Sequence, residues 1–97
     1  MIIDFEKVAM YVKPGQTDMR KQINGLSVIV QEELRPDPFS RALFLFCNKP
    51  RHLLKILYWD KTGFTLWVKR LATERFFWPK DRKSVTAITA EQLEEKL

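Results

Sequence analysis

The side chains that most often carry catalysis or bind metals are few and scattered in this sequence. Cys47 and His52 are each the sole residue of their type, so the chain cannot form an intramolecular disulfide or a zinc site made of Cys and His ligands. His52 is expected to be an exposed loop residue beside Lys49 and Arg51, whose charges disfavour a protonated imidazole and repel a metal ion. Cys47 ends an aliphatic and aromatic run, where a thiol behaves as a small core side chain.

The carboxylates do not indicate catalysis either. Asp18, Asp37 and Asp60 are explained by a helix cap, a turn before proline and the end of a strand, and no pattern brings them together. A metal-dependent phosphoryl-transfer enzyme would need at least two convergent carboxylates. The three glycines stand singly, so there is no phosphate-binding loop. We therefore predict a binding protein that is not an enzyme and has no metal or cofactor.

Composition predicts one small folded domain over residues 1–97. Hydrophobic residues make up 45% of the chain and charged residues 30%, and 17 Lys and Arg against 12 Asp and Glu give a formal charge of +5. Several of the acids lie near the two ends, so the interior is more basic than the total, which favours a polyanionic partner. The first residues lack the features of a signal peptide, and no apolar run is long enough to span a bilayer. We expect a cytoplasmic protein without membrane contact, and the oligomeric state stays open.

The first third of the chain predicts a strand, a turn and a long helix. Residues 8–12 are β-prone and are followed by a turn at 13–15, where Gly15 supplies the permissive backbone position. Thr17 or Asp18 can cap a helix that ends before Pro36. Its apolar positions recur with the helical period at Met19, Ile23, Leu26, Val30 and Leu34. Gly25 inside this helix suggests close packing of another element.

The rest of the chain predicts an antiparallel meander. Residues 42–47, 53–60 and 64–71 are β-rich and are separated by 48–52 and 61–63, lengths that suit hairpins. Residues 75–78 are a candidate for one more short strand. A capping box at 89–92 predicts a short helix over 89–97. The expected fold is α+β: an antiparallel β-meander with one long helix packed on one face and a short C-terminal helix.

Aromatic and basic residues alternate in the predicted meander. Strict alternation puts Lys55 and Trp59 on one face of their strand, and Trp67 and Lys69 on one face of the next. The two tryptophans would then be near neighbours flanked by two lysines, which is a platform on which exposed bases stack. The alternative is that the tryptophans only cover the second face of the sheet. Both interpretations are open.

A second basic group begins the predicted helix. Arg20 and Lys21 precede Asn24, and cations at a helix N-terminus oppose the macrodipole, so local helix stability does not explain them. They are either solvated or in contact with phosphates. Further cations that would contribute to phosphate binding are Lys69, Arg70, Arg75, Lys80, Arg82 and Lys83.

Five short segments of this sequence, in a fixed order along the chain, form a recognisable pattern. They are PGQTDMRKQINGL at 14–26, DPFS at 37–40, KILYWD at 55–60 with GF at 63–64, KRL at 69–71, and FWP at 77–79. Together they resemble the TnpB accessory protein of insertion-sequence family sixty-six, over residues 10–79. The resemblance implies a small accessory protein encoded beside a transposase in a bacterial mobile element. Such a protein is associated with DNA transposition but is not the strand-transfer enzyme.

The resemblance indicates which residues are shared with the family but not what each of them does. It implies no catalytic residue, and its shared polar or aromatic positions are Arg20, Lys21, Asn24, Trp59, Asp60, Lys69 and Arg70. The sequence departs from the family pattern at Arg41, where glycine is usual, and before Arg75, where a glycine is missing. A positive φ would be costly for Thr73 or Glu74 in that last turn.

The predicted function is a transposition accessory factor that binds DNA or the transposition nucleoprotein complex. The proposed surface consists of Arg20, Lys21, Asn24, Lys55, Trp59, Trp67, Lys69 and Arg70. The alternative is an adaptor that binds the transposase, or another protein of the same element, without touching nucleic acid. Trp59, Trp67, Phe77 and Trp78 would then anchor a protein interface. Salt separates the two, because phosphate binding weakens steeply with salt.

Overall fold

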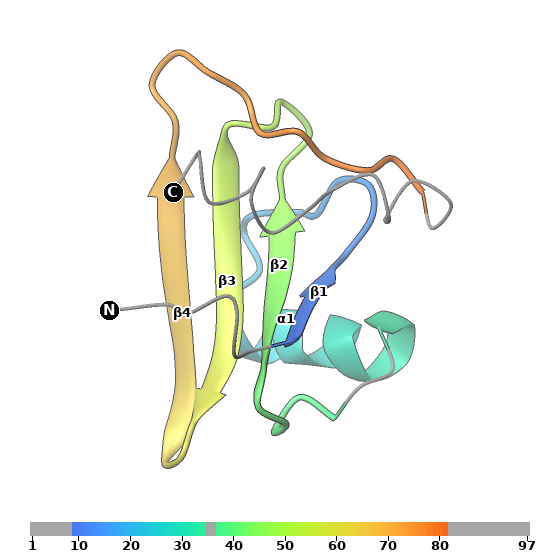
Figure 1. Ribbon diagram of the computed structural model, residues 1–97, viewed down its shortest axis with the longest axis vertical. Helices are drawn as coiled ribbons and strands as arrows, with labels where there is room; N and C mark the ends of the chain where they lie inside the picture. Colours follow the sequence, from blue (N-terminus) through green and yellow to red (C-terminus); the bar gives the residue numbers. More distant parts are fainter. Residues whose placement is uncertain (1–8, 35–36, 82–97) are drawn as a thin grey trace.

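In the residues that the structure describes, the fold is a four-stranded mixed sheet with one helix, whose α-helical part continues as a π-helix (Figure 1). The computed structural model describes residues 9–34 and 37–81. Its elements are β1 (Ala9–Val12), α1 (Ile23–Ile29), the π-helical η1 (Val30–Leu34), β2 (Ala42–Cys47), β3 (Leu53–Asp60) and β4 (Gly63–Arg70). The antiparallel meander is confirmed for β2, β3 and β4. The first strand joins the sheet beside β2 in parallel, which makes the sheet mixed. The predicted helix over 89–97 lies outside the described residues.

The central strand β2 is buried on both faces. None of its six residues exposes more than 4% of its surface. On one face, Leu26 and Val30 of the helix pack with Phe44 and Phe46. On the other face, a second cluster contains Leu43, Leu45 and Ile56 together with Phe76 and Trp78 from the segment after β4. The sequence of such a strand is a continuous apolar run, and other apolar residues must pack against both of its faces.

The cover on the second face is residues 71–81, and it corrects the expectation of a short strand at 75–78. This segment has no strand structure and runs across the end of the sheet, next to the loop between β2 and β3 (Figure 1). The Phe76 amide donates to the Arg51 carbonyl at 2.7 Å, and the Trp78 indole Nε1–H donates to the Lys13 carbonyl at 3.0 Å. The turn after β4 needs no glycine, because neither Thr73 nor Glu74 has a positive φ.

The helix is confirmed, but it begins later than the sequence predicts. Its first residue is Ile23, and Gln22 occupies the N-cap position without a side-chain hydrogen bond. Thr17 and Asp18 are not its cap. Lys55, which is only 5% exposed, explains the delay. Its ammonium donates to the carbonyl oxygens of Met19 and Lys21 at 2.8 and 2.9 Å, and a helix starting at Thr17 or Asp18 would need those oxygens for its own hydrogen bonds.

Two predictions about glycine have different outcomes. The turn at 13–15 is confirmed, because Gly15 has φ +75°, a conformation that other residues adopt at a cost. Gly25 does allow a close approach, but its neighbour is not another element. A Cβ built on Gly25 would lie 3.3 Å from the side-chain stem of Lys21, in the turn that precedes the helix.

We predict that Lys55→Met lowers the free energy of unfolding by about 1–3 kcal/mol, because two carbonyl oxygens lose a charged donor. Urea denaturation followed by circular dichroism measures this change. Lys69→Met is the matched control: Lys69 lies on the neighbouring strand and is only partly buried, so its replacement should change stability by about 0.5 kcal/mol or less. Equal stability of Lys55→Met and the parent protein would contradict a structural role for this buried ammonium.

Candidate nucleic-acid interface

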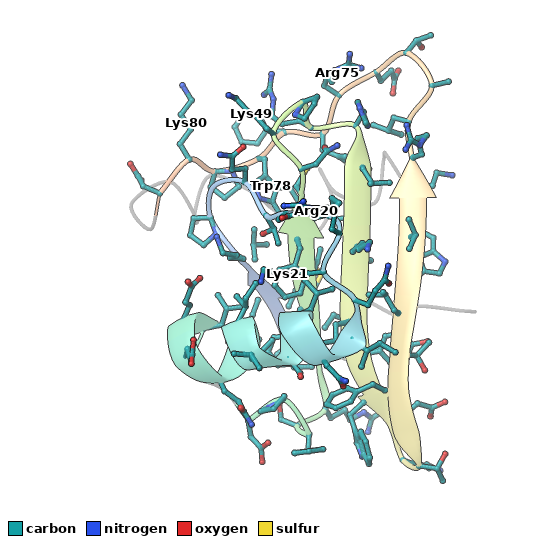
Figure 2. All side chains as sticks on the ribbon, turned by 180° about the vertical axis from the view of Figure 1, so that it is seen from behind. Arg20, Lys21, Lys49, Arg75, Trp78 and Lys80 are labelled. Atoms are coloured by element: carbon teal, nitrogen blue, oxygen red, sulfur yellow. The ribbon has the colours of Figure 1, made fainter. Side chains whose placement is uncertain are left out.

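Four cations from two chain segments gather at one end of the sheet. Lys49 and Arg51 belong to the loop between β2 and β3, and Arg75 and Lys80 belong to residues 71–81. All four side chains are exposed. Figure 2 shows Lys49, Arg75 and Lys80 projecting from this end, with Trp78 beneath them. We call these four residues the basic end.

Backbone hydrogen bonds fasten the segments of the basic end to each other. The Gly15 amide donates to the Pro79 carbonyl at 2.8 Å, and the Phe76 amide donates to the Arg51 carbonyl at 2.7 Å. Trp78 adds its indole bond to Lys13 at 3.0 Å. Three stretches far apart in the sequence therefore hold a fixed arrangement around the cations.

The loop between β2 and β3 is itself tightly organised. The Asn48 side-chain oxygen accepts from the amides of His52 and Leu53, both at 3.1 Å. Arg51 has φ 64°, a left-handed conformation that costs roughly 1 kcal/mol for a residue other than glycine. His52 is partly buried, with its Nδ1 atom 3.4 Å from Asn48 Nδ2, so its expected loop position is confirmed, whereas its expected exposure is wrong.

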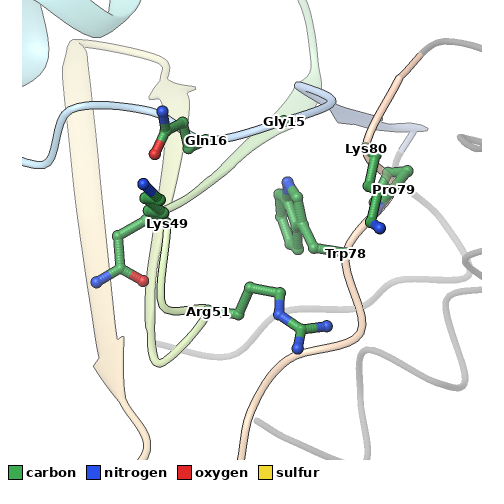
Figure 3. A pocket seen from close by; sticks show the side chains of 8 residues that line it. Gly15, Gln16, Lys49, Arg51, Trp78, Pro79 and Lys80 are labelled. Carbon is green, nitrogen blue, oxygen red and sulfur yellow. The ribbon is translucent and has the colours of Figure 1, made fainter.

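The basic end surrounds a pocket of about 230 Å³. Trp78 and Pro79 form its apolar part, and Lys49, Arg51 and Lys80 stand around it. Figure 3 shows the Trp78 ring between Lys49 on one side and Lys80 on the other. Its remaining lining comes from Gly15, Gln16 and Asn48. The pocket combines an aromatic ring with three cations, and Arg75 is the one member of the basic end outside its lining.

The aromatic platform predicted from the sequence does not form. Trp59 is paired with Phe64, whereas Trp67 is paired with Ile56, and directly paired residues point to the same face of a sheet. Because Ile56 and Trp59 are three positions apart in β3, the two tryptophans lie on opposite faces. Trp59 packs in an aromatic cluster with Phe39 and Phe64, at ring-centroid distances of 4.9 and 5.1 Å. Trp67 packs against the core on the side of Ile56.

The two lysines of that platform are also separated. Lys55 points to the helix side, where its ammonium is buried and bonded to two carbonyl oxygens. Lys69 is paired with Leu54 and therefore lies on the other face. Lys55 thus positions the turn before the helix and is not a surface cation.

The other predicted site residues lie on the helix side of the sheet or at the end of β4. Arg20 and Lys21 share the turn before α1 and are exposed, as is Asn24 in the first turn of the helix. Arg70 is exposed at the end of β4. The Arg20 guanidinium donates to both carboxylate oxygens of Asp18, with the shortest bond at 2.7 Å. Arg20 is therefore already paired with an acid.

In the sequence, Lys49 and Arg51 stand out only as neighbours of His52, and Arg75 and Lys80 only as additional cations. A usable signal was present in the order of the elements. In a meander, the loop before one strand and the chain after the next strand lie at the same end of the sheet. Counting cations in 48–52 together with 71–80 would have located the basic end.

The thiol of Cys47 lies in the core. Cys47 is fully buried, and burial raises the pKa of its thiol to about 12, so the predicted core role is confirmed. In residues 9–34 and 37–81, no three His, Cys, Asp or Glu side chains are grouped as a metal site would require. No helix in these ranges has the length and apolarity needed to cross a membrane.

The model of a protein family described as "IS66 Orf2 like protein" matches residues 8–97. The chain belongs to this family. It is also 36% identical over 93 residues to the uncharacterized protein y4hO of Sinorhizobium fredii (strain NBRC 101917 / NGR234), a match that covers 96% of this chain and 81% of the relative. A second protein of that strain, the uncharacterized protein y4jC, is 31% identical over 75 residues, which cover 77% of this chain and 64% of y4jC. No solved structure matches the chain.

Membership of the IS66 Orf2-like family confirms the resemblance seen in the five segments. It identifies the chain as an accessory protein of a transposable element, in a family that is accessory and not catalytic. The chain spans 64% of the length of y4jC.

We predict that Asp18 titrates with a pKa of about 2, because the Arg20 side chain, then the Arg20 amide, hydrogen-bond its charged form. Because the pKa of Asp18 is lower in the folded protein than in the unfolded chain, the ion pair stabilises the fold at pH values above the usual carboxyl pKa. This stabilisation is lost as the pH falls through about 2. Carboxyl carbon NMR measures the midpoint directly. Arg20→Ala should raise it towards 3.8, and an unchanged midpoint in that variant would contradict the ion pair.

Proposed function

We propose that this IS66 Orf2-like protein supports transposition by binding DNA through its basic end. The observation that carries the proposal is the convergence of Lys49, Arg51, Arg75 and Lys80 from two segments that backbone hydrogen bonds fasten together. Cations held at one end of a small domain bind phosphates with little loss of backbone freedom, because the segments that carry them are already ordered.

The cations of the basic end supply affinity for DNA, but they contribute little to recognition of its sequence. Phosphate contacts release counterions and position a protein on DNA, but they carry no sequence information by themselves. Recognition of the element's ends would then come from the transposase or from another protein of the element. Lys21 and Arg70 are exposed and extend the surface along the helix side, whereas Arg20 is engaged by Asp18 and contributes less.

We predict that the purified protein binds duplex DNA at about 50 mM salt and loses affinity by about 100-fold at 200 mM, as expected for about four phosphate contacts. The test variant is Lys49→Ala/Arg51→Gly. It removes two charges from the basic end, and glycine suits the φ of 64° at position 51. Its salt slope should fall by about two, because each lost phosphate contact removes about one. Fluorescence anisotropy with a duplex of the element's end sequence and an unrelated duplex measures both quantities.

Arg41→Ala/Lys61→Gly is the matched control. It also removes two charges and also places glycine at a positive φ, since Lys61 has φ 45°. Arg41 precedes β2 and Lys61 follows β3, so both lie at the opposite end of the sheet from the basic end. Equal losses in the two double variants would contradict binding at the basic end. Failure of the parent protein to bind duplex at 50 mM salt would contradict direct DNA contact and favour the adaptor that binds the transposase.

A further inference from the structure

The pocket at the basic end is a different feature from the charged surface around it, because it has an aromatic wall and a limited size. We infer that it receives a single unpaired nucleotide of DNA, with the base against Trp78 and Pro79 and the phosphate beside Lys49, Arg51 or Lys80. This inference rests on the proposed function and names the form of DNA that the basic end prefers.

The apolar wall is held in place by two hydrogen bonds to the turn at residues 13–15. Trp78 is 7% exposed, with its indole bonded to Lys13 at 3.0 Å, and the Pro79 carbonyl accepts from Gly15 at 2.8 Å. A fixed wall costs little conformational entropy when a ligand arrives. A base has an apolar, π-rich face, and contact between bases and aromatic side chains is the usual source of affinity for unpaired nucleic acid.

The charge around the pocket selects a phosphorylated ligand. Lys49, Arg51 and Lys80 line it from two segments (Figure 3), and no Asp or Glu is among its lining residues. A neutral apolar molecule would leave these cations without a counterpart. A nucleotide instead supplies an apolar face and an anion at a short fixed separation, and Gln16 adds an amide that can hydrogen-bond the edge of a base.

The size of the pocket excludes a duplex. Its volume of about 230 Å³ is below the roughly 300–1,000 Å³ of most small-molecule sites, so it has room for no more than a single base. A base inside a duplex presents its faces only to its neighbours, and it must leave the stack to reach such a pocket. Unpaired DNA avoids that unstacking cost of a few kcal/mol.

The three tryptophans provide a direct test with the intact chain. In a ¹H–¹⁵N NMR spectrum, the indole N–H signals of Trp59, Trp67 and Trp78 are assigned with Trp59→Phe and Trp67→Phe. The probe is the tetranucleotide of thymidine, with a duplex, thymidine and inorganic phosphate added separately. We expect the tetranucleotide to shift the Trp78 signal, whereas Trp59, packed at the other end of β3, stays unchanged. Thymidine or phosphate alone should shift Trp78 less.

Lys80→Ala and Arg75→Ala are a matched pair of variants, since both side chains belong to the basic end but only Lys80 lines the pocket. Lys80→Ala should weaken tetranucleotide binding by about threefold, the effect of one exposed ionic contact, and Arg75→Ala should weaken it less, because Arg75 lies outside the pocket. Duplex binding that is lost in Lys49→Ala/Arg51→Gly without any Trp78 shift from the tetranucleotide would overturn the nucleotide pocket and leave the proposed function standing. Absence of binding to both forms of DNA would overturn both.

Discussion

The double-sided burial of β2 is the constraint on which the rest of the structure depends. A strand whose six residues all lie in the core needs apolar cover on both faces, and a chain of 97 residues has few elements to supply it. The helix covers one face, and Phe76 and Trp78 cover the other. Since no second helix is available in the described residues, the cover comes from an irregular segment that must be tied down by its own hydrogen bonds. Those ties bring the cations of the basic end together.

Much of the fold was predictable, because apolar periodicity reports burial directly. The helical spacing from Met19 to Leu34 predicted the face that packs on the sheet, and the three β-rich runs predicted the meander. The start of the helix was not predictable. It depends on the Lys55 ammonium, which takes two carbonyl oxygens from a turn 34 and 36 positions earlier in the chain. A sequence shows the capping residues but not a distant donor that competes for the same oxygens.

The predicted aromatic platform was wrong because the register between β3 and β4 was predicted wrongly. Alternation within β3 was right, but the faces of β3 and β4 were matched wrongly. The predicted loop of three residues, 61–63, would let Trp59 and Trp67 share a face. In the structure Gly63 pairs with Asp60, so the loop is one residue shorter, and a change of one residue reverses every side chain of the second strand. The strand expected at 75–78 was wrong for a different reason. Buried Phe76 and Trp78 alternate with exposed Arg75 and Phe77, and this alternation indicates an extended chain but not that the chain pairs in a sheet.

Backbone strain alone does not identify a binding residue in this molecule. Arg51 and Lys61 both adopt a positive φ, which costs energy for any residue with a Cβ. Lys61 does so in the turn between β3 and β4, where the tight connection requires a positive φ. No described pocket includes Lys61. Arg51 differs because its carbonyl accepts from Phe76 and its side chain lines the pocket. The left-handed conformation of Arg51 thus accompanies the hydrogen bond that joins residues 71–81 to the loop. Glycine at position 51 would relieve the strain, but arginine there keeps a cation at the pocket.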